Sequence, residues 1–480
     1  MSGIDHPQIS SSPSSPETED DEAHLFYHSN TSCDPDISEH HSAMDMLCCH
    51  SVQDSLLSSS SCFTNYRGIL NWIIILLILT HAHLFLENFI QHGFLIDLRK
   101  VLEHLMQDNY NWPSVNLILA ANMFAITALL LERRLQKGGL SSSTGHWLHL
   151  ANLGLLALFP SLVILYDSSI STGGAFFSLW SYITLGLKLY SYQETNRWYR
   201  QEHVICSGME KSSILLTEEH PEHLTIKHLY YFLLAPTLCY QREFPSTSRV
   251  RINILLHRLM EMVLLVQIMV GIVQQWVTPL FQQSENYFSN MDLTGQVGML
   301  VGLVAPTHFL WLLFFFLFTH SYLNFCAELL CFGDRKFYGD WWNAQTLASF
   351  WRNWILPFEK WKNRHLYTPL LRHKVSPKQA ELLVFLLAAA LCEYMVALPL
   401  HNCRLWIFLT MVFELLVSVC LGRYFRGNYG NGMVWLCLLL GPPLAVMTYF
   451  HDNYVSHHHY HHHHHHVGQC RPGLPAAIAT

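Results

Sequence analysis

The pattern of hydrophobic and polar positions is dominated by long apolar runs that are separated by shorter polar stretches. Many of these runs have about 20 residues, the length that an α-helix needs to cross the hydrocarbon core of a bilayer. They predict an all-α, polytopic membrane protein with about nine transmembrane helices, because helices satisfy their own backbone hydrogen bonds in lipid. The predicted spans are 68–90, 114–131, 147–166, 172–190, 254–275, 297–327, 379–400, 404–422 and 432–450.

Lysine and arginine are concentrated in two of the loops between these spans. One loop follows the second span and contains Arg133, Arg134 and Lys137, and the other is the segment 332–376 after the sixth span. Loops rich in Lys and Arg stay on the cytoplasmic side of a membrane. We therefore expect the N-terminus and the 332–376 segment to be cytoplasmic, and the C-terminus to lie on the opposite side.

The two ends of the chain differ from its apolar middle. Residues 1–60 are rich in Ser, Asp, Glu and His, a composition that buries too little apolar area to fold, so we predict a disordered cytoplasmic tail. Residues 456–480 contain HHHYHHHHHH and are interpreted as a low-complexity tail, with transition-metal binding by its imidazoles as the alternative. Residues 61–455 form the predicted membrane domain.

Composition narrows the class of protein further. Hydrophobic residues make up 51% of the 480 residues and charged residues only 13%, about half the charged share of soluble domains. The net charge of −7 is small for this length and indicates no nucleic-acid partner. The 13 cysteines are scattered without CxxC spacing, which argues against a zinc site or a disulfide scaffold. We expect no metal and no other cofactor.

One predicted span carries a single charge, in the stretch LCEYMVALPL at 391–400. A carboxylate is costly to bury in such a run, so Glu393 indicates a functional interior. Its sequence neighbours are Cys392 and Tyr394. A thiol in apolar surroundings stays protonated and is a poor base. Cys392 and Glu393 are therefore candidate catalytic residues that would need a further activating group.

Two histidines in the predicted sixth span are the other polar candidates within the membrane. They are His308, near the start of the span, and His320, near its end. A histidine at this depth either lines a polar chamber or forms a hydrogen bond to a neighbouring helix. The sequence leaves both possibilities open.

The predicted cytoplasmic segment before the glutamate-bearing span interleaves aromatic and basic side chains, in FYGDWWNAQTLASFWRNWILPFEKWKNRHLYTPLL at 337–371. Such a mixture suits a membrane interface. It also suits a surface for an anionic amphiphile, whose phosphates bind basic groups and whose acyl chain or base contacts aromatics. The position directly before the glutamate-bearing span favours the second interpretation.

Within this segment, FYGDWWN at 337–343 resembles the FYxDWWN signature of the sterol and diacylglycerol acyltransferases, a branch of the membrane-bound O-acyltransferase superfamily. Further stretches are similar to the acyl-CoA:diacylglycerol O-acyltransferases: NYRGILNW (65–72), LYYFLLAPTLCY (229–240) and RHLYTPLL (364–371). The resemblance covers nearly everything from about residue 50 to 455.

The resemblance implies a nine-helix protein of the endoplasmic-reticulum membrane that encloses a buried catalytic chamber. Acyl-CoA, a substrate rather than a cofactor, would enter from the cytoplasm and diacylglycerol from the bilayer. A chamber histidine would act as general base on the diacylglycerol hydroxyl, which attacks the thioester. Self-association is also implied, as a homo-oligomer or a hetero-oligomer with an active relative. The candidate acyl-CoA-binding residues are Phe337, Tyr338, Asp340, Trp341, Trp342, Asn343, Trp351, Trp354, Ile355, Glu359, Tyr367 and Tyr454.

The chain departs from the family pattern at positions to which the resemblance assigns the chemistry. Where the family has His-Glu-Tyr, this chain has Cys392-Glu393-Tyr394, so the general base is missing. Ile355 stands where the family has an asparagine that polarises the acyl-CoA carbonyl. Glu359 replaces a histidine and puts an acid where the anionic acyl-CoA is expected.

Two further departures fall in the last two spans. The family's Gly-Gln-Pro is Gly441-Pro442-Pro443 here, and Glu414 stands where related enzymes have a glutamine. Loss of one oxyanion donor costs about 10²–10³ in turnover and loss of a general base about 10²–10⁴, although such effects need not multiply. The sequence therefore favours weak or no turnover. The alternatives are a fully active diacylglycerol O-acyltransferase with a rearranged site, or a non-catalytic lipid-binding partner subunit.

Overall fold

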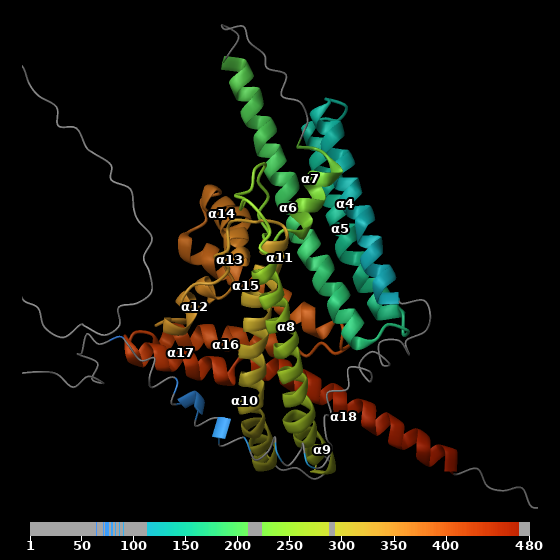
Figure 1. Ribbon diagram of the computed structural model, residues 1–480, viewed down its shortest axis with the longest axis vertical. Helices are drawn as coiled ribbons and strands as arrows, with labels where there is room; N and C mark the ends of the chain where they lie inside the picture. The colour runs from blue at the N-terminus through green and yellow to red at the C-terminus, as the bar shows by residue number, and fades with distance from the viewer. Residues whose placement is uncertain are drawn as a thin grey trace, which may run out of the picture. The chain divides into compact units, whose positions relative to one another are not determined.

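The computed structural model describes residues 113–209, 223–287 and 293–469, with scattered positions between 64 and 90 (Figure 1). The chain divides into two units, Met1–Ile74 and Ile75–Thr480, and the account below concerns the second. The predicted 1–60 tail lies outside the described residues, and the predicted 68–90 span is described only at scattered positions, which are helical. The described ranges are otherwise built of helices and loops, with one isolated β-bridge, so the all-α prediction is confirmed for them.

Three long helices form the first bundle: α4 (Pro113–Gln136), α5 (Ser142–Tyr166) and α6 (Thr172–Met209). They pack on one another along their lengths (Figure 1). The short helix α7 (Ile226–Leu234) joins their apolar core, where Leu129, Tyr182 and Phe232 are buried. One buried polar group is paired within the bundle: the Tyr182 hydroxyl donates to the carbonyl of Leu117 at 2.7 Å.

Helix α6 is 38 residues long and continues well past the predicted 172–190 span. The predicted span ended where the apolar run gives way to SYQETN at 191–196. In the structure all six of these polar residues are buried, none more than 5% exposed. The helix continues because α4, α5 and the loops that follow α7 cover this polar turn.

The second group of helices contains two long segments that each include a π-helical turn. One runs through α8 (Ile252–Ile272), η1 (Val273–Val277) and α9 (Thr278–Tyr287). The other runs through α10 (Leu293–Phe315), η2 (Phe316–Tyr322) and α11 (Leu323–Leu329). Helix α8 packs against η2, α10 and α11. π-Helical turns of this kind are frequent at functional sites.

The 332–376 segment folds into short helices, and the last four helices follow it. The short helices are η3 (Trp341–Asn343), α12 (Leu347–Trp354), α13 (Leu356–Lys362), η4 (Asn363–Tyr367) and α14 (Thr368–Arg372). The last helices are α15 (Pro377–Ala397), α16 (Trp406–Leu421), α17 (Asn428–Leu440) and α18 (Pro442–Gln469).

The predicted 432–450 span is divided in the structure. Gly441 separates α17 from α18 and takes neither helical nor strand dihedral angles. A proline at the first helical position is favourable, because its missing N–H has no partner there, and Pro442 begins α18 in this way. Helix α18 then continues through residue 456, where the predicted tail begins, to Gln469.

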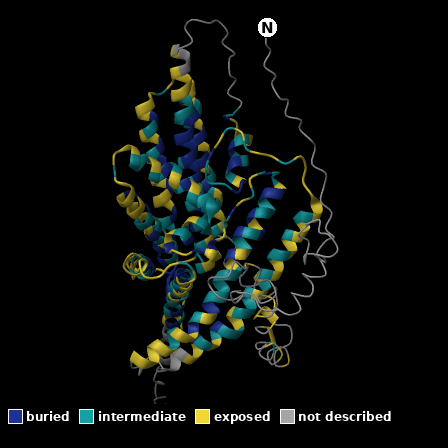
Figure 2. Cartoon of the chain, turned by 90° about the vertical axis from the view of Figure 1, so that its left-hand side faces the viewer, coloured by how far each residue is buried: buried dark blue, intermediate teal, exposed yellow. Residues whose placement is uncertain are grey.

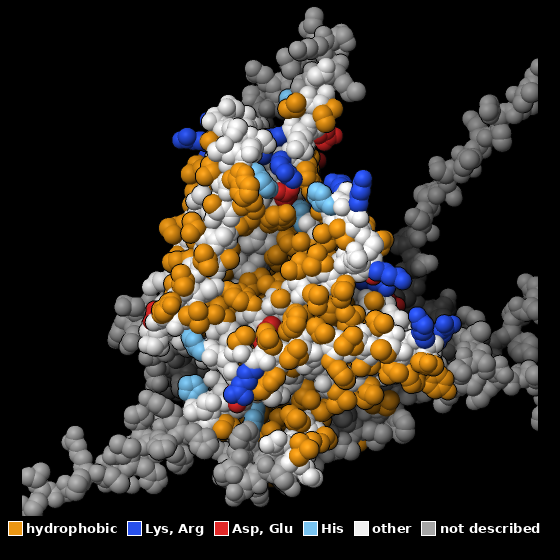
Figure 3. Space-filling model, turned by 180° about the vertical axis from the view of Figure 1, so that it is seen from behind, with side chains coloured by type: hydrophobic (Ala, Val, Ile, Leu, Met, Phe, Trp, Pro, Cys, Tyr) orange, Lys and Arg blue, Asp and Glu red, His pale blue; other side chains and the backbone are white. Residues whose placement is uncertain are grey.

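Six helical segments in the described ranges are long and apolar enough to cross a membrane, and α16 is a shorter apolar helix. Buried residues gather between the helices and exposed ones along their outer faces (Figure 2). No residue of α8 is buried, and hydrophobic side chains cover much of the face in Figure 3. An outer surface of this composition suits a lipid environment, since soluble proteins rarely expose large contiguous apolar patches.

Candidate functional site

Aromatic side chains of the 337–343 signature and of α12 meet in one cluster. Trp354 stacks on Trp311 of α10, with ring centroids 4.5 Å apart and planes 11° apart. Trp341 meets Trp354 edge-on at 5.1 Å and 82°. Tyr338 and Trp351 pack on the same cluster. The structure thus brings together four of the candidate acyl-CoA-binding residues, and it makes Trp341, which is 6% exposed, a core residue.

The other signature residues lie around this cluster rather than in it. Phe337 is buried in a neighbouring cluster with Phe332 and Ala327. The side chains of Asp340, Trp342 and Asn343 are exposed.

The backbone of Trp342 ties the signature to α17. Its carbonyl accepts hydrogen bonds from Asn431 Nδ2 at 3.0 Å and from Trp435 Nε1 at 3.3 Å. His308, one of the two histidines predicted to be polar candidates, packs against Trp435 and Trp311. The signature is therefore anchored to both α10 and α17.

Ile355 and Glu359 occupy one short stretch at the start of α13. Ile355 connects α12 to α13 and provides no side-chain cap. The Glu359 carboxylate lies 2.8 Å from Lys362 Nζ, one helical turn away, and both side chains are 14% exposed. The acid that was expected to repel acyl-CoA thus has its charge offset within the same helix.

The last two candidate acyl-CoA-binding residues, Tyr367 and Tyr454, also lie outside the aromatic cluster. Tyr367 ends the π-helical turn η4. Tyr454 belongs to α18 and contacts Phe281 of α9, with ring centroids 5.5 Å apart. It packs on a separate cluster that contains Val277 and Leu303. The structure does not bring Tyr454 together with the signature tryptophans.

Glu393 is buried and accepts several hydrogen bonds. Its Oε2 accepts from the backbone N–H groups of Ile407 at 3.0 Å and Phe408 at 3.3 Å, in the first turn of α16. Its Oε1 accepts from the Tyr449 hydroxyl of α18. A carboxylate at a helix N-terminus satisfies N–H groups that have no partner within the helix. Glu393 therefore joins α15, α16 and α18.

Cys392, one position earlier, takes no part in the hydrogen bonds that Glu393 forms to α16 and α18. Its side chain is exposed and its thiol is free. Among the described residues, its electrostatic neighbours are Lys362 and Glu393, and Glu393 already accepts the hydrogen bonds from α16 and Tyr449. Tyr394, on the other side of Glu393, forms a hydrogen bond with Ser161 of α5.

The two departures in the last spans are neighbours in space. Glu414 of α16 is buried, and both of its carboxylate oxygens lack a hydrogen-bond partner. One of these oxygens lies against Gly441, so closely that a Cβ added there would be 1.7 Å from it. The same Cβ would be 2.5 Å from the backbone carbonyl oxygen of Cys437, so a larger residue at 441 would meet backbone as well as the Glu414 side chain. Pro442 begins the next helix directly beside this contact.

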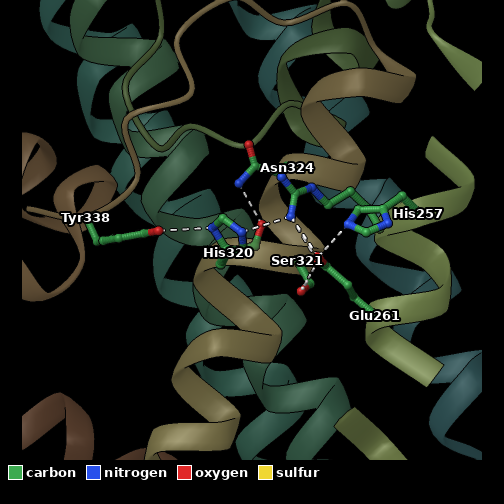
Figure 4. A network of polar contacts seen from close by, with 7 residues as sticks. His257, Glu261, His320, Ser321, Asn324 and Tyr338 are labelled. Atoms are coloured by element: carbon green, nitrogen blue, oxygen red, sulfur yellow. Dashed lines mark hydrogen bonds and ion pairs between the residues drawn. The ribbon is translucent and has the colours of Figure 1, made fainter. Parts of the chain in front are cut away.

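A polar network connects α8, η2 and the signature (Figure 4). Arg258 Nη1 lies 2.8 Å from His320 Nε2 and 2.9 Å from Glu261 Oε2. Because a guanidinium only donates, His320 Nε2 accepts, and Nδ1 carries the hydrogen that is donated to the Tyr338 hydroxyl at 3.0 Å. Ser321 donates to Glu261 at 2.9 Å. Of the two roles left open for His320, the structure shows the interhelical hydrogen bond.

The sequence analysis missed a second anchor of the 332–376 segment. His365 Nε2 lies 2.9 Å from Ser191 Oγ in the polar turn of α6, and Ser191 Oγ also accepts from the backbone N–H of Tyr240. The ring of His365 stacks on Trp198. Burial, together with the charge of Arg364, lowers the pKa of His365 to about 4. The available signal was the polar run 191–196 directly after an apolar run.

Comparison with known proteins shows the family to which this chain belongs. Residues 174–451 match the model of the membrane-bound O-acyltransferase family, and the chain belongs to this family of multi-pass membrane proteins. Among its relatives, diacylglycerol O-acyltransferase 1 of Homo sapiens is 45% identical over 411 residues, which cover 85% of this chain and 84% of that protein. The Bos taurus protein is 44% identical over 418 residues, 85% of each chain.

A plant relative is similar over nearly the same share of the chain, at a lower identity. Diacylglycerol O-acyltransferase 1-2 of Oryza sativa subsp. japonica is 34% identical over 412 residues, 84% of each chain. The resemblance inferred from the sequence is confirmed, and so is the all-α, polytopic membrane class. The chain is a member of the membrane-bound O-acyltransferase family of the diacylglycerol O-acyltransferase 1 type.

Proposed function

We propose that this chain keeps the fold and substrate surfaces of an acyl-CoA:diacylglycerol O-acyltransferase but turns over weakly or not at all. The observation that carries the proposal is the arrangement at Cys392 and Glu393. The carboxylate of Glu393 is taken up by the first turn of α16 and by Tyr449. Cys392 is exposed and forms no disulfide bond, and the family resemblance assigns the general base to this position.

Acyl transfer from a thioester to an alcohol needs two kinds of group. A general base removes the hydroxyl proton as the oxygen attacks, and a donor stabilises the negative charge that develops on the carbonyl oxygen. A protonated thiol at 392 supplies no base. The isobutyl side chain of Ile355 supplies no donor. Both requirements of the transition state are thus unmet at the positions that the family resemblance assigns.

The substrates follow from the relatives, which are named for acyl transfer to diacylglycerol. In this proposal acyl-CoA and diacylglycerol bind to a multi-pass protein of the endoplasmic-reticulum membrane, with its N-terminus in the cytoplasm. The aromatic cluster around Trp354 supports one wall for an acyl chain. Assembly with an active relative would give a chain without turnover a role as a lipid-binding subunit.

The test is an assay with labelled oleoyl-CoA and diacylglycerol, in microsomes from cells that lack endogenous acyltransferase. Unmodified protein is compared with Cys392→Ala, and the human relative serves as positive control. We expect both forms to give triacylglycerol at or near the background level. Clear activity that disappears in Cys392→Ala would overturn the proposal and make the cysteine a catalytic nucleophile, through an acyl-thioester intermediate.

Restoration of the missing groups is a second, independent test. Cys392→His returns a base but leaves the thioester carbonyl without its donor, so we expect little recovery. Cys392→His combined with Ile355→Asn should recover clearly more, because groups that act together have non-additive effects. Full recovery by Cys392→His alone would contradict the importance of Ile355.

A further inference from the structure

The connection between α16 and α17 projects from the fold, away from the residues discussed so far. Its residues 421–426, LGRYFR, are all exposed. Tyr424 is 81% exposed, and Tyr429, in the first turn of α17, is 75% exposed. The side chains of this connection therefore contact the surroundings of the protein rather than its interior.

The two segments that this connection joins place it at the surface of the bilayer. Helix α16 is a short apolar helix, and Asn428–His458 is a candidate membrane span. Only residues 422–427 lie between α16 and α17, and they form turns and irregular backbone. Irregular backbone that is not covered by protein does not occur within hydrocarbon, because its polar groups would have no partners. The connection therefore lies at the level of the lipid headgroups.

Contacts to the signature place the connection on the same side of the membrane as the 332–376 segment. Asn431 Nδ2 donates to the carbonyl of Ala344 at 2.8 Å as well as to that of Trp342. A Cβ added to Gly430 would lie 2.6 Å from the carbonyl oxygen of Gln345, so the two backbones are in close contact. The 332–376 segment is expected to be cytoplasmic, and the cytoplasmic leaflet is the one that carries anionic lipids.

The charge of the connection is positive and uncompensated. Arg423 and Arg426 are the only charged residues in 421–431, and neither forms an ion pair with a described residue. The contacting stretch 341–345 contains no acid, and Asp340 directly before it balances at most one of the two charges. A guanidinium group matches the geometry of a phosphate or a carboxylate. Exposed tyrosines beside it are typical of the membrane interface, where the ring meets lipid and the hydroxyl meets water.

We propose that residues 421–429 form a docking surface for the headgroup of an acidic phospholipid in the surrounding bilayer. Arg423 and Arg426 donate to the anionic oxygens of the headgroup, while Tyr424 and Tyr429 lie beside it at the interface. Acyl-CoA also carries phosphates, but a lipid is favoured because this short connection joins two apolar segments at the bilayer surface. Because the start of α17 is attached to the signature, a bound headgroup stabilises α17 against the 341–345 stretch.

The experiment uses the full chain in nanodiscs of phosphatidylcholine with an increasing share of phosphatidylserine, and it measures the thermal midpoint of unfolding. We expect the midpoint to rise and to reach a plateau as phosphatidylserine is added. The rise should shrink at 1 M salt, where the Debye length falls to about 3 Å. A second arm adds oleoyl-CoA to discs of phosphatidylcholine alone. No rise with phosphatidylserine overturns the proposal, and a rise with oleoyl-CoA that alone depends on Arg423 and Arg426 overturns it in favour of acyl-CoA.

Variants separate this surface from the general positive charge of the protein. Arg423→Gln combined with Arg426→Gln should weaken the response to phosphatidylserine roughly 25-fold, about fivefold for each basic side chain near an anionic surface. The matched control is Arg134→Gln combined with Lys137→Gln, which removes two charges from exposed positions of another basic loop and should keep the rise. Both double variants should unfold at the same midpoint as the unmodified protein in pure phosphatidylcholine.

Two further comparisons keep the test decisive. Arg423→Lys combined with Arg426→Lys retains both charges and should retain most of the rise. If the double glutamine variant does not fold, Arg423→Gln and Arg426→Gln are compared singly with Arg134→Gln, each with an expected loss of about fivefold. Equal losses in the connection variants and in their controls would show that only the overall charge is measured and would refute the docking surface.

Discussion

Two glutamates in neighbouring helices of this protein differ in almost everything except burial. Glu393 of α15 is 4% exposed and Glu414 of α16 is 5% exposed. The first accepts hydrogen bonds from two backbone N–H groups and from Tyr449. The second has no hydrogen-bond partner on either oxygen among the described residues. Residue type and burial therefore do not define the role of an intramembrane carboxylate, whereas its partners do.

The comparison also indicates what holds this part of the scaffold together. Glu393 connects three helices through hydrogen bonds that do not involve Cys392. A change at residue 392 is therefore expected to leave the helix contacts of Glu393 in place. Glu414, in contrast, forms no hydrogen bond to a described residue, and one of its oxygens lies against Gly441. The same substitution at each position should have effects of opposite sign.

The largest expected effect is at Glu393. Glu393→Met leaves two backbone N–H groups of α16 without a partner and removes the acceptor of the Tyr449 hydroxyl, at about 1–3 kcal/mol for each lost hydrogen bond. The Tyr449 hydroxyl still accepts from the backbone N–H groups of Arg404 and Trp406. We expect the free energy of unfolding to fall by about 4 kcal/mol, seen as a lower thermal midpoint in detergent. Glu381→Met, at an exposed position of the same helix, is the control. A midpoint within a degree of the unmodified protein would mean that Glu393 does not stabilise α16.

The next effect extends the comparison to a buried group, His365, which lies outside the candidate membrane spans. His365 has a pKa of about 4 in the folded protein, below the usual value of about 6.5. Between these values the unfolded chain binds a proton that the folded chain does not, so stability is complete above pH 6.5 and falls as the pH drops toward 4. The loss reaches at most about 3 kcal/mol, at 1.36 kcal/mol per pKa unit.

The pH dependence of the thermal midpoint tests this expectation. His365→Phe removes the proton-binding group, so its midpoint should decline less between pH 6.5 and 4.5. His373→Phe, at an exposed position, should decline as the unmodified protein does. An unchanged decline in His365→Phe would show that other groups cause it.

A smaller effect of the opposite sign is expected at Glu414. Glu414→Met replaces an unpartnered buried carboxyl group by an apolar side chain of similar length. Burial of a polar group without a hydrogen bond costs roughly 1–3 kcal/mol in proteins. We therefore expect the free energy of unfolding to rise by about 1 kcal/mol after repacking, seen as a higher thermal midpoint. A decrease as large as that of Glu393→Met would show that Glu414 has a partner in the membrane and would remove the distinction between the two glutamates.

The smallest expected effect is at a third glutamate, Glu359, which forms an ion pair with Lys362. Glu359→His frees Lys362 from its ion pair and removes a negative charge from the expected path of acyl-CoA. We expect acyl-CoA to bind up to about fivefold more tightly in an equilibrium measurement in detergent, since a partly exposed pair contributes up to about 1 kcal/mol. Glu359→Gln is the charge control. Equal affinities in all three proteins would show that acyl-CoA does not approach residue 359.

The sequence alone predicted much of this protein because its strongest signals are local. Apolar runs of the right length identify helices directly, since lipid forces each span to satisfy its own backbone. For this reason α4, α5 and α15 begin and end within a few residues of the predicted spans. The signature FYGDWWN was also sufficient to place the chain in its family. The candidate roles of Cys392, Ile355 and the other site residues remain predictions.

The partners of each side chain were decided by tertiary structure alone. Glu393 and Glu414 are both single acids in apolar runs, and nothing local distinguishes the one that caps a helix from the one that contacts a glycine. The extension of α6 through its polar turn likewise depends on α4, α5 and His365, which lie far away in sequence. The periodicity and composition of a segment indicate whether lipid, water or protein surrounds it. A hydrogen bond between distant segments forms only where the fold brings a donor and an acceptor within about 3 Å of each other.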